Sequence, residues 1–231
     1  MILEAKNVSY YYKSQRDKLI LDHVSYGFEC GKLYAILGPS GSGKTTLLSL
    51  LAGLDVPIQG EICYDGKPIT TKDLAEHRRH HISLVFQSYN LIDYLTPLEN
   101  VKLGGKGDPK ALLGSMGIGE EYWNRSVLQL SGGQQQRVAI ARALVNNPAV
   151  ILADEATGNL DTRTSFEILV LFQKLYAEGR TIIFVTHNPD IAKYSSRNIE
   201  LRDGHIISDT YNDHILSAAE GLAALPANTD E

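Results

Sequence analysis

A glycine-rich stretch early in the chain carries a lysine and two threonines, residue types that suit phosphate binding. The stretch is Gly38-Pro39-Ser40-Gly41-Ser42-Gly43-Lys44-Thr45-Thr46. Its glycines have no Cβ atoms, so successive backbone N–H groups can turn inward onto one anion. Lys44 adds a positive charge for the β- and γ-phosphates, and the Thr45 hydroxyl is a ligand type for Mg2+. We therefore predict a nucleotide-binding phosphate loop here.

The flanks of this loop support the same prediction. An apolar run at 33–37 indicates a buried strand before it, and the residues from 47 to 53 indicate a helix after it. A helix N-terminus directs unpaired N–H groups and the positive end of the macrodipole at the phosphates. The alternative is a turn that binds nothing, but the pattern arises by chance in only about one chain of this length in a hundred.

Two acidic residues follow another apolar run. The run at 150–153 is typical of a buried parallel strand, and Asp154 and Glu155 come directly after it. Open α/β sheets bind ligands at the carboxyl ends of their strands. Asp154 is therefore placed to hold the Mg2+ shell, and Glu155 to face an attacking water. Two solvated carboxylates at the start of a loop are the alternative.

The stretch Leu130-Ser131-Gly132-Gly133-Gln134 opens a predicted helix. Ser131 is a good N-cap, and Gln134 three residues later completes a capping box. An ordinary capped helix is one interpretation. However, two glycines in a first turn cost about 1 kcal/mol each in helix propensity relative to alanine. That cost is explained if a ligand approaches the backbone closely, so we expect a second anion site here.

Four further side chains stand where predicted elements end or begin. Gln87 ends one apolar run, and His187 follows another on the sheet edge where the phosphates are expected. A lone histidine is otherwise more often structural. Tyr12, at the end of a strand, either continues a run of strand tyrosines or stacks on an adenine ring. Asp161 is a candidate N-cap for a helix at 162–177.

The basic run His77-Arg78-Arg79-His80-His81 has two interpretations. We expect a solvated basic face, because charge runs are usually solvated. A metal site is the alternative, although no carboxylate or cysteine completes its ligand set. Cys30 and Cys63 match no zinc or redox spacing and are expected to be reduced, buried thiols.

The composition limits the class of protein. The chain has 231 residues, 43% of them hydrophobic, and a net charge of −5. This charge argues against a nucleic-acid partner, because phosphate neutralisation needs a basic face. The N-terminus does not resemble a secretory signal, and no apolar run approaches the roughly 20 residues of a membrane span. We expect a soluble, intracellular protein whose role at a membrane depends on a partner.

Three parts are predicted along the chain. Residues 1–210 form one ATP-binding domain, and a small, mostly helical subdomain at about 88–135 is inserted in it. Early strands at 2–10 and 19–28 are joined by a polar loop at 13–18. Residues 211–231 have weak periodicity and are expected to be a poorly ordered tail.

The motifs taken in order resemble the ATP-binding subunit of an ABC transporter. They are the phosphate loop at 38–45, Gln87, residues 130–134, Asp154-Glu155, Asp161 and His187. The five residues at 130–134 arise together by chance in only about one such chain in several thousand. The resemblance extends to about residue 210. It implies an α/β P-loop NTPase fold with a mainly parallel core sheet, an antiparallel β subdomain and a shortened helical subdomain.

Details resemble the MacB/LolD/FtsE-like branch, whose ATPases work with membrane subunits that export drugs, peptides or lipoproteins or that transmit force. The stretches 80–87 and 90–95 look most like Vex-type exporter ATPases of Gram-positive cocci. Two features depart from the family. Ala156 replaces the usual proline, and the segment between Gln87 and Ser131 is about one helix shorter than in most members. The shortening leaves the membrane partner open.

The resemblance implies a role for each site residue. Tyr12 stacks on adenine, and residues 38–46 cradle the phosphates. Thr45 and Gln87 ligate Mg2+, and Asp154 holds it through water. Glu155 is the general base, and His187 contacts the γ-phosphate. Lys44 and Gln87 complete the catalytic set with these two.

By the same resemblance, Ser131 and Gly133 serve the ATP of a second protomer in a head-to-tail dimer. Gly132, Gln134 and Asp161 belong to the same nucleotide-binding set. Phosphoryl transfer depends on neutralising charge, and no arginine stands in a recognisable finger position near the phosphate loop. Donors from a second subunit would supply that charge, and a two-fold pair both gives and receives them.

We therefore predict a Mg2+-dependent ATPase that dimerises on ATP. It would act at the cytoplasmic face of the cell membrane through a separate, MacB-like transmembrane permease that exports a peptide, drug or lipid-linked substrate. The alternative is a regulatory or mechanotransmission ATPase of the FtsE type, which switches a membrane complex without transport. The sequence indicates neither the substrate nor the direction of transport.

Overall fold

The strands form two sheets in this computed structural model, which describes residues 1–13 and 18–226. The antiparallel sheet has the order β2-β1-β4-β5 and contains β1 (Leu3–Tyr10), β2 (Leu21–Phe28), β4 (Gln59–Tyr64) and β5 (Lys67–Pro68). The larger sheet has the order β10-β9-β3-β8-β7-β6. Its members are β3 (Leu33–Leu37), β6 (Ile82–Val85), β7 (Val150–Asp154), β8 (Thr181–Val185), β9 (Arg197–Arg202) and β10 (His205–Tyr211).

The larger sheet is parallel except where β9 pairs with β10. The predicted α/β architecture, with a mainly parallel core sheet and an antiparallel sheet near the N-terminus, is therefore confirmed. The middle of the polar loop expected at 13–18 falls on 14–17, outside the described residues.

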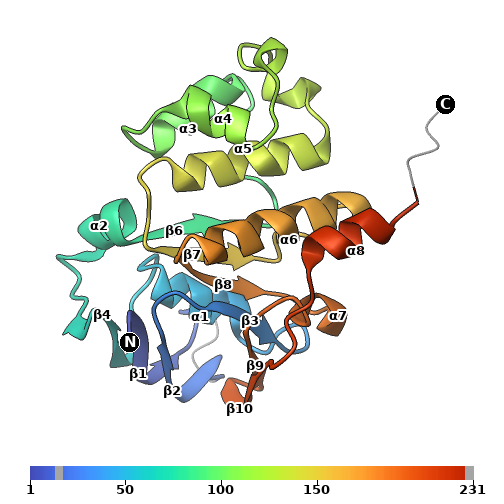
Figure 1. Cartoon of the computed structure of the whole chain (residues 1–231). Helices are drawn as coiled ribbons and strands as arrows, with labels where there is room; N and C mark the ends of the chain where they lie inside the picture. The colour runs from blue at the N-terminus through green and yellow to red at the C-terminus, as the bar shows by residue number, and fades with distance from the viewer. Residues whose placement is uncertain (14–17, 227–231) are drawn as a thin grey trace.

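Three of the helices gather at one end of the molecule (Figure 1). The helices are α1 (Lys44–Leu51), α2 (Leu74–Glu76), α3 (Pro97–Gly104), α4 (Pro109–Ser115), α5 (Gly132–Leu144), α6 (Thr162–Ala177), α7 (Pro189–Ala192) and α8 (Ala218–Ala224). Figure 1 shows α3, α4 and α5 together, far from the antiparallel sheet. The limits of this group as a subdomain remain a prediction. Across residues 1–13 and 18–226, no helix is both long and apolar enough to cross a membrane.

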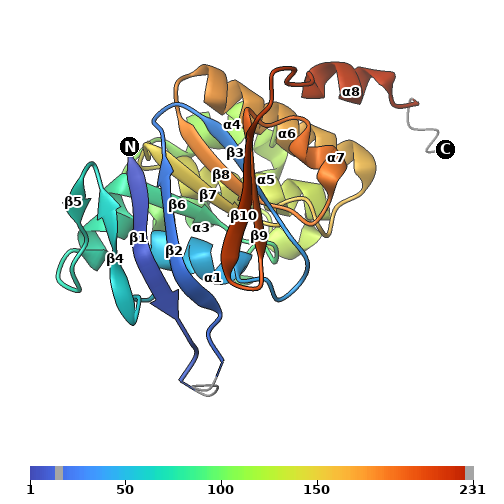
Figure 2. The same cartoon turned by 90° about the horizontal axis from the view of Figure 1, so that it is seen from below.

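The core sheet is buried on both faces, which explains its continuous apolar strands. Neighbouring side chains of a strand point to opposite faces. In β7, Val150 and Leu152 pack with α1 and the antiparallel sheet, whereas Ile151 and Ala153 pack with α5 and α6. Figure 2 shows β1 and β2 on the side of the core sheet where α1 lies. The buried sheet thereby fixes the positions of the segments that follow its strands. The candidate site lies on these segments.

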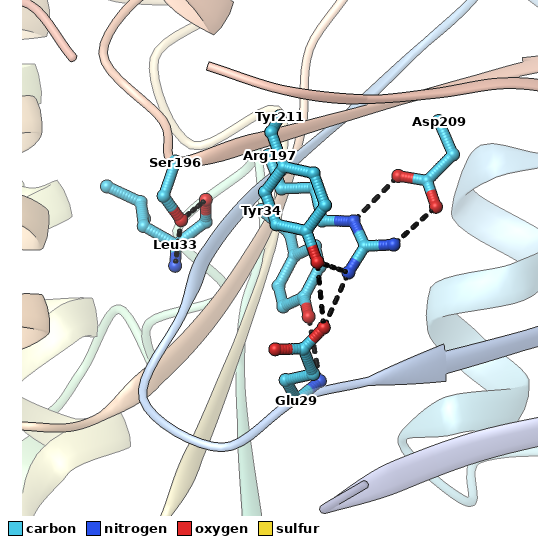
Figure 3. A network of polar contacts seen from close by, with 7 residues as sticks. All are labelled: Glu29, Leu33, Tyr34, Ser196, Arg197, Asp209 and Tyr211. Carbon is cyan, nitrogen blue, oxygen red and sulfur yellow. Dashed lines mark hydrogen bonds and ion pairs between the residues drawn. The ribbon is translucent and has the colours of Figure 1, made fainter. Parts of the chain in front are cut away.

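A polar network fastens the β9–β10 hairpin to the turn between β2 and β3 (Figure 3). Arg197 donates two hydrogen bonds to Asp209, of 2.7 and 2.6 Å, and a third, of 2.7 Å, to Glu29. Tyr211 lies against the guanidinium, 4.4 Å from its ring centre, and its hydroxyl donates to Glu29. The bonds to Asp209 raise the pKa of Arg197 and lower the pKa of Asp209. The network holds together strands that lie far apart in the sequence.

A poorly ordered tail was expected at 211–231, and the structure contradicts this for 211–226, whereas 227–231 lie outside the described residues. Residues 218–224 form α8, which packs on α6 (Figure 1). The Gln173 amide accepts a hydrogen bond from the backbone N–H of Ala218, at 2.8 Å, and donates one to the carbonyl of Leu216, at 2.7 Å. Gly221 leaves no room for a Cβ beside the ring of Phe166. Small residues make this contact, so no apolar periodicity marks it.

Two smaller expectations also need correction. The basic run forms a π-helical turn in which Arg78, Arg79 and His80 are exposed but His77 is buried. The His77 Nε2 donates to the carbonyl of Leu51 at the end of α1, at 2.9 Å. Within 1–13 and 18–226, no cluster of three potential metal ligands occurs. Both cysteines are free thiols, and Cys63 is buried as expected, whereas Cys30 is exposed.

Candidate nucleotide-binding site

The phosphate loop connects β3 to α1, as its flanking sequences predicted. Its three glycines adopt positive φ values: 148° at Gly38, 79° at Gly41 and 104° at Gly43. A Cβ on Gly38 would overlap the carbonyl oxygen of Leu201, and one on Gly43 would lie 2.8 Å from the carbonyl oxygen of Ile20. Both positions therefore need glycine for backbone conformation and for space.

Lys44 is a buried cation at the start of α1, with 5% of its surface exposed. Its Nζ donates to the carbonyls of Gly38 and Pro39, both at 2.8 Å. Burial lowers the pKa of Lys44, and the charges of Glu155 and Asp154 oppose this shift. Neutral carbonyls compensate the buried charge of Lys44 only in part. An anion bound in the loop would complete this compensation.

A cavity of about 310 Å³ lies over the loop. It is lined by Tyr12, Ile20, Ser40, Gly41, Gly43, Lys44, Thr45, Thr46 and Glu155. Tyr12 is 43% exposed, and its hydroxyl shares a hydrogen bond with the Thr46 hydroxyl at 2.9 Å. Ser42, although part of the loop, is not among the residues that line the cavity. It is buried, and its hydroxyl has no hydrogen-bond partner among the described residues.

The two carboxylates leave the end of β7 in different directions. The Thr45 hydroxyl donates to the Asp154 carboxylate at 3.0 Å. Burial raises the pKa of Asp154, and the bond from Thr45 opposes that shift. Glu155 has a left-handed backbone, with φ of 45°, and its Oε1 lies 3.3 Å from Nδ1 of His187. Glu155 thus lies between the phosphate loop and the end of β8.

Gln87 and Glu155 both lie near Gly158. A Cβ on Gly158 would be 3.1 Å from the Gln87 amide nitrogen and 3.4 Å from Glu155 Oε2. The Gln87 amide also donates to Asn159 at 3.5 Å. Of the three predicted magnesium ligands, Thr45 and Asp154 are therefore in direct contact, and Gln87 lies beside Glu155. Hydroxyl, carboxylate and amide oxygens are the hard ligands that Mg2+ takes, so this set fits the ion.

The N-terminus of α5 has the predicted capping box. Ser131 Oγ accepts from the Gln134 N–H at 3.2 Å, and Gln134 Oε1 accepts from the Ser131 N–H at 2.9 Å. The nearest atoms to the two glycines belong to this chain. A Cβ on Gly132 would lie 2.8 Å from the Tyr89 hydroxyl, and one on Gly133 would overlap Thr164. Close packing within the chain therefore explains these glycines without a ligand.

Neither residues 131–134 nor Asp161 line the cavity over the phosphate loop, as far as described residues form it. Asp161 is the N-cap of α6, as predicted. Its carboxylate accepts from the Thr164 N–H at 2.9 Å and from the Thr164 hydroxyl at 2.6 Å. These bonds lower the pKa of Asp161. The chain thus has two separate groups of predicted site residues.

The sequence did not reveal two polar contacts that α5 makes with distant loops. Gln136 is fully buried, and its amide donates at 3.0 Å to the carbonyl of Ala156, beside Glu155. Arg142 donates to the carbonyls of Tyr89 and Asn90, shortly after Gln87. Each residue stands in a polar or mixed stretch that indicates a solvent-facing position. Only the tertiary structure brings them to the loops that contain Gln87 and Glu155.

Comparisons with known proteins identify the family of this chain. The model of the ABC transporter family matches residues 21–158. The chain is 45% identical over 214 residues to the ABC transporter ATP-binding protein YclH of Bacillus subtilis, covering 88% of this chain and 94% of that protein. It is 44% identical over 225 residues to the macrolide export ATP-binding/permease protein MacB of Hyphomonas neptunium, covering 91% of this chain but 35% of that protein.

A solved structure agrees as well. The ATP-binding cassette MJ0796, as a dimer in a post-hydrolysis state bound to ADP and Pi, superposes with a TM-score of 0.83 and 38% identity. The match covers 91% of this chain and 98% of that one. Family, relatives and fold agree, and the chain belongs to the ABC transporter family as an ATP-binding subunit.

Proposed function

We propose that two copies of this chain hydrolyse ATP with Mg2+ at shared sites and thereby power a separate membrane permease. One observation carries the proposal. The cavity over the phosphate loop has Lys44 as the one basic side chain among its described lining residues, while the α5 N-terminus lies outside it. The γ-phosphate needs more positive charge than one lysine supplies.

Each side chain of the site then has a role. Tyr12 offers its ring to adenine, and the phosphate loop with Lys44 holds the phosphates. Thr45, Gln87 and Asp154 hold Mg2+, which supplies positive charge to the transferred group when bound. Glu155 accepts the proton of the attacking water. His187, 3.3 Å from Glu155, holds this carboxylate and reaches toward the γ-phosphate.

The α5 N-terminus would complete the site of a second copy. Gly132 and Gly133 would present their backbone N–H groups and the positive end of the α5 dipole to an anion. Ser131 and Gln134 shape this turn through their capping box, and Asp161 belongs to the same set as the N-cap of α6. A two-fold pair satisfies both surfaces at once, so a homodimer forms when ATP is bound. The dimeric MJ0796 structure with ADP and Pi supports this arrangement, since the fold is shared.

The partner is a MacB-like permease on a separate chain. The relatives named MacB combine ATP-binding and permease functions, and this chain matches 35% of one of them. We therefore place the chain at the cytoplasmic face of a cell membrane, driving export of a peptide, drug or lipid-linked substrate. The Vex-like stretches at 80–87 and 90–95 favour an exporter of that type.

Mixing two inactive variants tests the shared site. Lys44→Ala disables the phosphate loop, and Ser131→Arg blocks the α5 N-terminus, so neither variant alone should hydrolyse ATP. In an equal mixture, half of the dimers contain one complete site, and about a quarter of wild-type turnover should return. A chain with both substitutions, mixed with Lys44→Ala, is the control and should stay inactive. If the first mixture also stays inactive, the shared site is refuted.

A further inference from the structure

The loop after Gln87 contains two consecutive non-glycine residues with left-handed backbone. The φ values are 47° at Tyr89 and 48° at Asn90. Asparagine tolerates this conformation, but a bulky tyrosine there is an outlier. Such residues cost free energy and persist only where surrounding contacts hold them. The loop therefore needs an external support.

Arg142 provides that support from α5. One guanidinium nitrogen donates to the carbonyl of Asn90 at 2.6 Å, and another donates to the carbonyl of Tyr89 at 3.0 Å. Hydrogen bonds from a charged donor are roughly twice as strong as neutral ones. The rigid fork of arginine also fixes the directions of both carbonyls, which a lysine cannot do. The two bonds thus act on the two strained residues themselves.

Gln87 depends on this loop for its position. Its side chain is exposed, and the described residues give it one long hydrogen bond, the 3.5 Å contact with Asn159. The backbone must therefore set where the amide lies. Tyr89 also contacts the other end of α5, since its hydroxyl lies against Gly132. Both ends of α5 therefore contact this loop.

We propose that Arg142 is a positioning residue that holds Gln87 beside Glu155 through the carbonyls of Tyr89 and Asn90. The inference rests on the proposed role of Gln87 in ATP hydrolysis. Because α5 also begins with the turn assigned to the partner's ATP, Arg142 ties the position of Gln87 to the position of that turn. A shift of α5 would move both together.

The test compares Arg142→Met with Arg137→Met in the full-length chain. Both arginines lie on α5, but Arg137 pairs with Glu167 of α6 and not with the loop. Arg142→Met should lower kcat about tenfold or more and leave ATP affinity within about twofold, because misplacing a catalytic group affects the reaction more than binding. Arg137→Met should not show this split. Arg142→Lys keeps the charge, so its kcat should lie between those of the wild type and Arg142→Met. It replaces Arg142→Met in the test if that variant does not fold.

A rescue separates positioning from general packing. Glycine adopts positive φ without strain, so Asn90→Gly should restore kcat of Arg142→Met by about threefold or more. Unchanged kcat in Arg142→Met, a parallel loss of ATP affinity, or no rescue would overturn the inference.

The variant Gln87→Ala distinguishes the inference about Arg142 from the proposed role of Gln87. If it leaves kcat unchanged, the role of Gln87 fails. If Gln87→Ala lowers kcat, adding Arg142→Met should lower it no further. An additive loss would refute the role proposed for Arg142 and leave the role of Gln87 intact.

Discussion

Replacing Gly133 with alanine should disturb this chain mainly through one neighbour, Thr164. The added Cβ would overlap the Thr164 methyl group and lie 3.2 Å from its hydroxyl oxygen. Rotating Thr164 would relieve the overlap but break its 2.6 Å hydrogen bond to Asp161. Thr164 is β-branched, and both its backbone N–H and its hydroxyl donate to Asp161, so its side chain cannot rotate freely.

The expected cost follows from these two routes. Overpacking costs about 1–3 kcal/mol, and losing a hydrogen bond to a charged group costs about 1.5–3 kcal/mol. Alanine regains up to about 1 kcal/mol of helix propensity, so Gly133→Ala should lower the free energy of unfolding by about 1 kcal/mol. Thr164→Ser removes the methyl and keeps the hydroxyl. In that background only the gain in helix propensity remains, so Gly133→Ala should stabilise by about 1 kcal/mol, a coupling of about 2 kcal/mol.

Urea unfolding of the wild type, both single variants and the double variant measures this coupling. If the two substitutions add within about 0.5 kcal/mol, the proposed contact is wrong. ATP turnover of the double variant answers a second question. Under the proposed shared site, a Cβ on residue 133 would also crowd the partner's nucleotide, so turnover should stay low although stability returns. Restored turnover would mean that Gly133 serves packing alone.

Two further predictions concern stability. Gly38→Ala should lower the free energy of unfolding by about 1–3 kcal/mol more than Gly41→Ala in urea titrations, because its Cβ meets Leu201 whereas that of Gly41 meets no atom within 4 Å; equal losses would contradict this. Asp209→Asn should cost about 2 kcal/mol at pH 7. Arg197 depresses the pKa of Asp209 below 3.8, so the stability it adds is present above that pH and lost as pH falls through the folded value. The two unfolding curves should therefore converge in acid, and a constant gap would argue against the pair.

The phosphate loop and the strand ends were predictable because local pattern determines them. A glycine-rich turn after an apolar run needs positive φ values, and the structure has them at Gly38, Gly41 and Gly43. The capping box at Ser131 and the α6 helix, which begins after Asp161, depend on neighbouring residues and were also predicted correctly.

Contacts between distant segments were not predictable. His77 belongs to a basic run, but its burial depends on the end of α1. The tail helix α8 uses alanine and glycine against α6, so no apolar stripe marks it. The glycines of α5 were attributed to a ligand, whereas Tyr89 and Thr164 are their immediate neighbours. In each case the deciding partner lies far away in the sequence.

The solution mass of Glu155→Gln with and without Mg-ATP tests the central claim most directly. The substitution removes the proposed general base but keeps Thr45 and Asp154, so ATP should bind and remain unhydrolysed. A mass that changes from one chain to two on adding Mg-ATP is the predicted result. A mass that stays at one chain, with ATP shown to be bound, would contradict a site shared by two copies of this protein.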